Sequence, residues 1–210
     1  MDLLEALNWR YAAKKMSGKV VDEEKVQAII EAARLAPSSN GLHPYKILLI
    51  TNQELKEKIQ PIAHNQSQVV TGSHLLVFAG LANYTEEHID NITAYSLEQR
   101  GKPEGYNPNH SNVLKSRFLK NNPEYNFEHI SKQVYLACGL AIAAAAELQV
   151  DSTPMEGFEP DALDALLNLE ELGLKSVLML ALGYRDEETD FMSRWNKVRT
   201  PYNDFVIEIK

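Results

Sequence analysis

The sequence predicts a mixed fold of α-helices and β-strands, built as one domain over residues 1–210. Three short apolar runs bounded by polar residues predict buried strands. These runs cover residues 45–51, 75–79 and 176–183. Apolar residues at helical spacing predict helices between the runs, and the longest of these helices spans 127–149. A chain of this length suits a single domain with a sizeable core, or one protomer of an intertwined oligomer.

The composition is that of an acidic, soluble protein. A net charge of -8 and a pI near 5.3 exclude the basic face that nucleic acid binding requires. Cys138 is the single cysteine, so an internal disulfide is excluded and a reducing compartment is favoured. The most apolar stretch, 136–148, is well short of the roughly 20 residues that span a membrane. The N-terminus has no signal-peptide pattern, so we expect a cytoplasmic protein that binds neither nucleic acid nor membrane.

The first 70 residues predict three helices. A short helix leads to Arg10. The second begins after Asp22 as N-cap and ends just before Pro37, because proline disfavours helical geometry in the residue before it. The third covers 53–70, with a break at Pro61.

Residues 84–126 differ from the rest of the chain, because they are polar and carry mixed charge with scattered aromatic residues. They predict a helical excursion around a loop from 101 to 112. Such an insertion often serves as a lid, and a mobile surface loop is the alternative. Phe118 is then a candidate gate for the substrate.

The C-terminal part predicts a helix at 160–167 and an arm over 185–210. Residues 185–203 have no helix or strand pattern, whereas 204–209 alternates polar and apolar residues like a half-exposed strand. A strand at the end of an irregular arm cannot easily complete its own sheet. We therefore expect it to reach a partner subunit, and local folding back is the alternative.

Basic residues gather near both ends of the chain, at Arg10 and Lys14 and at Lys197 and Arg199. In a helix the first pair would share one face, and in an extended arm the second pair would point the same way. Between the pairs lie two loops that together hold two serines and two glycines. Their sequences are Pro37-Ser38-Ser39-Asn40-Gly41 and Pro154-Met155-Glu156-Gly157. On an acidic chain, this combination indicates a small phosphate-bearing ligand, although each pair alone is more often a solvated patch.

The order of six segments along the chain resembles the FMN-dependent nitroreductase family. Within that family it is similar to the oxygen-insensitive NAD(P)H nitroreductase and dihydropteridine reductase branch. The segments are 10–14, Pro37-Ser38-Ser39-Asn40-Gly41 with Pro44-Tyr45, Asn65 ahead of Ser73-His74, Lys132-Gln133-Val134-Tyr135-Leu136, Pro154-Met155-Glu156-Gly157-Phe158, and Lys197-Val198-Arg199. Each segment is moderately specific, and all six in this order span essentially the whole chain.

The resemblance implies an α+β fold of three layers, in which helices flank a central mixed, mostly antiparallel sheet. It also implies an obligate homodimer with two FMN sites at the subunit interface. The C-terminal arm would wrap the partner, and its strand would complete the partner's sheet. NAD(P)H would bind transiently over the flavin, and no metal is implied.

Residue by residue, the resemblance implies which side chains contact the phosphate of FMN and which contact its ring. Arg10, Lys197 and Arg199 would grip the phosphate by charge-assisted contacts. Lys14 and Asn65 would lie at the pyrimidine edge of the ring. The remaining residues implied to contact the cofactor are Tyr11, Ala12, Gln68 and, from the partner's loop, Pro37, Ser38, Ser39 and Gly41.

The segment Pro154-Met155-Glu156-Gly157 would run along the flavin ring. A backbone N–H of Glu156 or Gly157 would reach N5, and glycine suits such a close approach. Lys14 would favour the reduced ring, which is anionic, so the resemblance implies Lys14, Glu156 and Gly157 as catalytic residues, and the candidate gate Phe118 completes the predicted catalytic set. The implied reaction is ping-pong hydride transfer from NAD(P)H to a nitroaromatic, a quinone or a related electron-poor acceptor, with solvent supplying protons.

Two positions depart from the family pattern. Many relatives carry a hydroxyl residue where Ala12 stands, so one hydrogen bond to the cofactor is missing. Gln68 stands where close relatives carry a second lysine. We therefore expect a lower flavin potential than in those relatives, and a raised potential in a Gln68→Lys variant.

Other chemistry is not supported by the sequence. The six histidines show no metal-ligand spacing, and G-x-S-x-G, P-loop and G-x-G-x-x-G patterns are absent from the sequence. Two alternatives stay open. One is a dihydropteridine or free-flavin reductase on the same fold, and the other is a dimeric flavin-binding protein without turnover.

Overall fold

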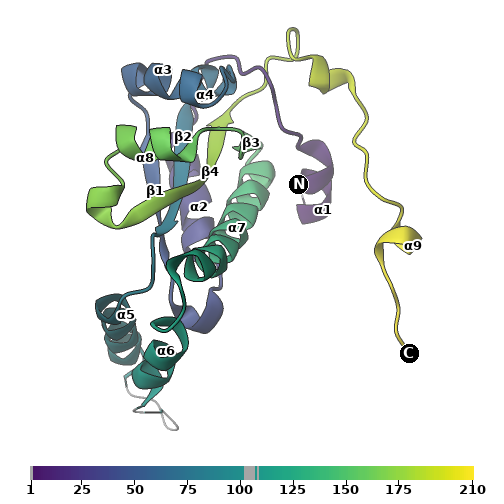
Figure 1. The fold of residues 1–210 in the computed structure, drawn as a ribbon. Helices are drawn as coiled ribbons and strands as arrows, with labels where there is room; N and C mark the ends of the chain where they lie inside the picture. Colours follow the sequence, from purple (N-terminus) through teal and green to yellow (C-terminus); the bar gives the residue numbers. More distant parts are fainter. Residues whose placement is uncertain (1, 102–106, 108) are drawn as a thin grey trace.

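The computed structural model describes residues 2–101, 107 and 109–210. It has three layers, with a four-stranded sheet between two layers of helices (Figure 1). The strands are β1 (Tyr45–Ile50), β2 (His74–Leu81), β3 (Asp151–Met155) and β4 (Leu174–Gly183). Their order is β1-β2-β4-β3, and each of these pairs is antiparallel. The predicted α+β class and three layers are confirmed, and the described residues contain no parallel pair.

The three predicted strands are confirmed as β1, β2 and β4. Alternate residues of the two central strands face opposite helix layers, which explains why these strands read as continuous apolar runs. Leu76 and Phe78 pack toward α2 (Glu23–Arg34) and α7 (Pro123–Glu147). Leu75 and Val77 pack in the opposite layer, where α3, α4 and α8 lie.

The edge strand β3 was not predicted, since residues 154–157 were interpreted as a loop. Its sequence, Asp-Ser-Thr-Pro-Met, has no apolar run, and Ser152 and Thr153 are buried nonetheless. Pro154 is tolerated because β3 pairs with a single neighbour, β4, so that the missing N–H interrupts no second ladder.

The predicted helix over 53–70 forms as two helices, α3 (Gln53–Ile62) and α4 (Gln68–Thr71). The break comes just after Pro61. His64 and Asn65 there have φ of 52° and 57°, which a right-handed helix does not allow. The predicted break is therefore present, and it lies in a short loop just after Pro61, which itself belongs to α3.

The other helices follow the prediction closely. They are α1 (Leu3–Trp9), α2, α7 and α8 (Pro160–Leu166). α7 begins earlier than predicted, because the Asn122 side chain accepts from the backbone N–H of Tyr125 and Pro123 occupies the first turn.

The excursion contains α5 (Glu86–Gln99) and α6 (His110–Phe118). Of the predicted loop 101–112, residues 102–106 and 108 lie outside the described residues, and 110–112 belong to α6. Lys115 on α6 forms ion pairs with Glu86 and Asp90 on α5, each with an N–O distance of 3.0 Å, and these pairs join the two helices.

The C-terminal arm leaves the body of the protein after β4 and runs past α1 (Figure 1). It holds a short 3-10 helix over Phe191–Arg194 and the single turn α9 (Tyr202–Phe205). The predicted strand at 204–209 is therefore not formed in the single chain, where residues 206–210 have no regular structure. A strand needs a neighbouring strand to pair with, so pairing with a partner subunit stays a prediction.

Within the described residues, no helix is long and apolar enough to cross a membrane. The same residues contain no group of three or more His, Cys, Asp or Glu side chains placed to hold a metal ion. Burial raises the pKa of the Cys138 thiol to about 12, so this cysteine is a packing residue.

Candidate functional site

A cluster of cations forms where the chain leaves α1. Lys197, on the arm, donates from Nζ to the backbone carbonyls of Leu7 and Arg10. Burial, and then the charge of Arg199, lowers the pKa of Arg10. Burial, and then the charges of Arg10 and Arg199, lowers the pKa of Lys197. The three cations are therefore close enough to repel one another.

One atom of this cluster lacks a partner. Arg10 Nε is buried and has no hydrogen-bond acceptor among the described residues. A buried donor of this kind is costly unless a ligand satisfies it. Crowded cations with an unsatisfied donor are the arrangement that an anion such as a phosphate would stabilise.

The next segment of the chain is extended rather than helical. α1 ends at Trp9, and Arg10 has φ -70° and ψ 145°. The expectation that Arg10 and Lys14 share a helix face is therefore wrong. An extended chain rises about 3.3 Å per residue against 1.5 Å in a helix, so the two cations can lie farther apart than one helical turn. That separation suits an elongated ligand with its anionic group at one end.

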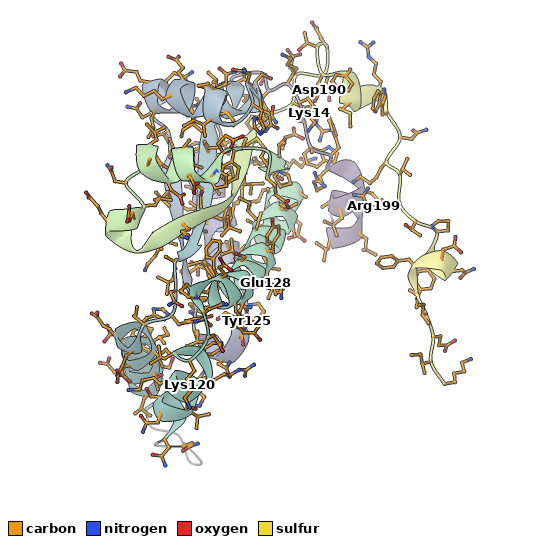
Figure 2. The ribbon with its side chains drawn as sticks, viewed as in Figure 1. Lys14, Lys120, Tyr125, Glu128, Asp190 and Arg199 are labelled. Atoms are coloured by element: carbon orange, nitrogen blue, oxygen red, sulfur yellow. The ribbon has the colours of Figure 1, made fainter. Side chains whose placement is uncertain are left out.

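Two buried carboxylates hold this segment against the end of the sheet. Asp190 accepts from the Tyr11 hydroxyl at 3.1 Å and from the Lys14 backbone N–H at 2.8 Å. Figure 2 shows Lys14 and Asp190 side by side, with Arg199 on the arm next to α1. Asp151, the first residue of β3, holds Arg185, which stacks on Trp9 and Tyr11.

The loop between α3 and α4 connects the segment that ends at Lys14 to the loop that follows β3. The Ser67 hydroxyl donates to the Lys14 carbonyl at 2.9 Å, and Gln66 Nε2 donates to the Gly157 carbonyl at 2.9 Å. Gln68 is buried and donates to Gln66 Oε1 at 3.0 Å. Asn65 is exposed beside them. The backbone of Lys14, the residues Asn65 and Gln68, and Gly157 thus lie in one region, and their roles toward a cofactor stay a prediction.

Glu156 and Gly157 follow β3 and are both exposed. Among the described residues, neither of their backbone N–H groups has a hydrogen-bond acceptor. A Cβ on Gly157 would lie 3.5 Å from Gln66 Nε2 and 3.6 Å from His64 Cδ2, which is ordinary contact. The protein alone therefore leaves room for a side chain at Gly157, and the two backbone donors there are available to a ligand.

A hollow of about 390 Å³ adjoins this loop. It is lined by Pro154, Met155, Glu156, Leu178 and one side of α7, namely Tyr135, Cys138, Gly139 and Ile142. Burial, and then Glu156, raises the pKa of Tyr135 to about 12, so Tyr135 stays neutral beside that carboxylate. The hollow is mostly apolar, as expected of a site for a planar ring.

The loop 37–41 does not join this region in the single chain. The backbone N–H of Ser39 donates to Gln133 Oε1 at 2.8 Å, and Ser38 Oγ accepts from the N–H of His43 at 3.0 Å. Gln133 and Tyr135 lie two residues apart on α7, which is about 200° around a helix. The loop is therefore on the opposite side of α7 from the hollow.

Phe118 is also away from the site. Its side chain is 1% exposed and packs against Tyr84 at a ring distance of 4.5 Å and His129 at 5.0 Å. A side chain buried in the core of the excursion cannot contact a substrate. The candidate gate is therefore corrected to a packing residue.

Sequence reasoning missed several residues that build the site. They are Gln66, Ser67, Asp151, Arg185 and Asp190. None belongs to a periodic pattern. The one available signal was that Gln66 and Ser67 lie between Asn65 and Gln68, which were already selected.

Comparisons with known proteins find similar chains over most of this sequence. The family model described as Nitroreductase family matches residues 7–184. YfkO of Bacillus subtilis, assigned by inference as an NAD(P)H nitroreductase, is 34% identical over 87% of this chain and 88% of its own length. The major NAD(P)H-flavin oxidoreductase of Aliivibrio fischeri is 28% identical over 97% of each chain. A crystal structure from Exiguobacterium sibiricum, of a protein assigned by inference as a nitroreductase in complex with FMN, has a TM-score of 0.83 and 22% identity, covering 100% of this chain and 98% of that one.

Proposed function

Because this chain belongs to the nitroreductase family, we propose that it is an FMN-dependent NAD(P)H oxidoreductase that reduces nitroaromatics, quinones or related electron-poor acceptors. The observation that carries the proposal is the cation cluster with its unsatisfied Arg10 Nε, one extended segment away from the exposed N–H groups of Glu156 and Gly157. This donor set fits a ligand with a phosphate at one end and a polar ring at the other.

In this proposal Arg10, Lys197 and Arg199 hold the phosphate of FMN. The chain's net charge of -8 would repel a dianion, so the local cluster supplies the attraction. Burial, and then repulsion between the cations, lowers the pKa of Arg10 and Lys197, and a bound phosphate would offset that repulsion.

Around the ring, the chain supplies donors and charge. FMN, when bound, supplies the two-electron redox chemistry. The Lys14 ammonium would stabilise negative charge at the pyrimidine edge, where Asn65 also donates. A backbone N–H of Glu156 or Gly157 would donate to the central ring nitrogen, N5. NAD(P)H and the acceptor would use the same open face in turn, which predicts ping-pong kinetics.

We propose further that the enzyme is a homodimer. Loop 37–41 faces away from the hollow in one chain, so a second chain would have to bring Ser38 and Ser39 to the cofactor. α7 carries an exposed apolar stripe next to the hollow, and the arm carries exposed apolar side chains at intervals along its length. The exposed apolar residues include Tyr135, Leu136 and Leu140 on α7 and Trp195, Val198, Tyr202, Phe205, Ile207 and Ile209 on the arm.

A charge in the α7 stripe should break the dimer. Leu140 is 40% exposed, so Leu140→Arg is compatible with the folded single chain. We expect the wild type to elute as a dimer and the variant as a monomer that has lost FMN, measured by size-exclusion chromatography with light scattering. Leu172→Arg is the matched control, because Leu172 is 62% exposed on a separate 3-10 turn. A wild-type monomer that binds FMN would contradict the dimer.

Gln68 offers a test of the ring assignment. Its amide donates to Gln66, whose own amide donates to the Gly157 carbonyl. The Gln68 amide also reaches Met155 Sδ at 3.4 Å. Gln68→Lys is expected to raise the midpoint potential of bound flavin by about 30 mV or more, since about 30 mV corresponds to about 1.4 kcal/mol for a two-electron couple. Gln68→Glu should lower it. The potentials are measured by anaerobic dye-coupled titration. Equal potentials in the wild type and both variants would contradict the placement of Gln68 near the flavin ring.

The function itself is tested by adding FMN to the purified protein and following the flavin absorbance. We expect a bound flavin that bleaches with NAD(P)H without oxygen and recovers when a nitroaromatic or quinone is added. Recovery with free flavin or a dihydropteridine alone would instead favour the reductase alternatives, and the name of the Aliivibrio fischeri relative makes free flavin the second candidate. A bound flavin that NAD(P)H leaves oxidised would indicate a binding protein, and a protein that takes up no FMN would refute the proposal.

A further inference from the structure

Arg10 is held in place by its two neighbours in the sequence. The guanidinium carbon of Arg185 lies 4.2 Å from the Trp9 ring centroid and 4.5 Å from that of Tyr11. Arg10 itself has extended backbone geometry at the end of α1, between these two rings in the sequence. The guanidinium of Arg185 therefore contacts the residues on both sides of Arg10 and holds this part of the backbone in place.

Arg185 is itself fixed by a buried carboxylate. Its Nη2 and Nε donate to Asp151 Oδ1 at 2.6 and 2.9 Å, and its backbone N–H donates to Oδ2 at 2.8 Å. The side chains of Arg185 and Asp151 are 15% and 3% exposed. The pair joins the end of β4 to the start of β3, so the stacked rings are tied to the rigid sheet.

Arg185 differs from the three clustered cations in its charge balance. Asp151 neutralises Arg185, whereas the described residues provide no ion pair for Arg10, Lys197 or Arg199. A neutralised guanidinium between two rings adds little attraction for an anion, although it can determine where another cation stands.

We propose that Arg185 is a positioning residue that aims Arg10 at the phosphate of the cofactor without touching the cofactor. This inference rests on the proposed function, in which Arg10 binds that phosphate. Arg185 thereby contributes to the discrimination between FMN and riboflavin, which has the same ring and lacks the phosphate.

The role requires arginine rather than any cation. A guanidinium is planar, so it can lie between two rings while it binds a carboxylate through two N–H groups. A lysine ammonium can still pair with Asp151 and keep the buried charge neutralised, but it cannot hold both rings in this way. Arg185→Lys is therefore the informative variant.

The test compares the Kd of FMN with the Kd of riboflavin, both measured by flavin fluorescence titration. We expect the wild type to prefer FMN. In Arg185→Lys the preference should fall about tenfold, the effect of one charge-assisted hydrogen bond. The riboflavin Kd should stay unchanged, since riboflavin does not use Arg10. Arg194→Lys is the matched control, because Arg194 is exposed on the arm and lies in no cation–ring pair of the described residues.

The outcomes separate the two levels of inference. An unchanged preference in Arg185→Lys, or an equal loss of both flavins, would overturn the positioning role and leave the function standing. A wild type that binds neither flavin would refute the proposed function, and the inference with it. If Arg185→Lys does not fold, Trp9→Leu removes one of the two stacked rings and is expected to show the same selective loss. An unchanged preference in that variant would likewise overturn the positioning role.

Discussion

Replacing Arg10 with methionine is expected to raise the Kd of FMN about 100-fold, the effect of one to two charge-assisted hydrogen bonds. The Kd of riboflavin should change little, because riboflavin has no phosphate for Arg10 to bind. Methionine is unbranched and flexible, and can fill the volume of the arginine stem. The reason for the selective loss is that Arg10 Nε is buried without a partner in the protein alone.

The same substitution should weaken FMN binding without lowering the stability of the protein that has no FMN bound. Burial and the charge of Arg199 lower the pKa of Arg10, so its charged form is disfavoured in the folded chain. Removing the charge should therefore leave the melting temperature without FMN unchanged or higher, while the stabilisation that FMN gives is reduced. Scanning calorimetry with and without FMN measures both effects. Arg194→Met is the control, and a wild-type Kd for FMN in Arg10→Met would contradict the assignment.

The Arg10 and Arg185 variants also test each other. If Arg185 acts only through Arg10, the double variant should prefer FMN no less than Arg10→Met does. Additive losses would show that the two arginines act independently.

The sequence predicted the parts of the fold that have a local pattern. β2 and β4 were found because both of their faces are buried, so their apolar runs are continuous. β3 was missed because it is short and polar. Its buried Thr153 is satisfied by a hydrogen bond at 2.8 Å to the carbonyl of Ala13, 140 residues away. No local pattern predicts such a contact.

The same distinction applies to the site. Arg10, Lys14, Lys197 and Arg199 were selected by residue type and by their order along the chain. The residues that orient them were missed, because Asp190 and Lys14 are 176 positions apart and Asp151 and Arg185 are 34 apart. Loop 37–41 was identified, but its position relative to the cofactor depends on a second chain.

Gly157→Val is expected to abolish flavin binding and leave the protein folded. In the protein alone, the nearest atoms to a new Cβ are 3.5 and 3.6 Å away, so the change in stability should be that of a surface substitution, within about 0.5 kcal/mol. The added side chain would project from the loop that is proposed to lie along the flavin ring. Because the ring is common to FMN and riboflavin, both should lose affinity by about 100-fold or more, in contrast to Arg10→Met.

Gly72→Ala is the contrasting variant, because a Cβ there would lie 2.6 Å from the carbonyl oxygen of Gln68 in α4. It should lower the free energy of unfolding by about 1–3 kcal/mol through overpacking. Chemical denaturation and flavin titration on both variants separate the two causes. If Gly157→Val destabilises the free protein as much as Gly72→Ala does, or if it binds FMN normally, the flavin ring does not lie against Gly157. The phosphate cluster would then have to serve a ligand oriented differently from the one proposed.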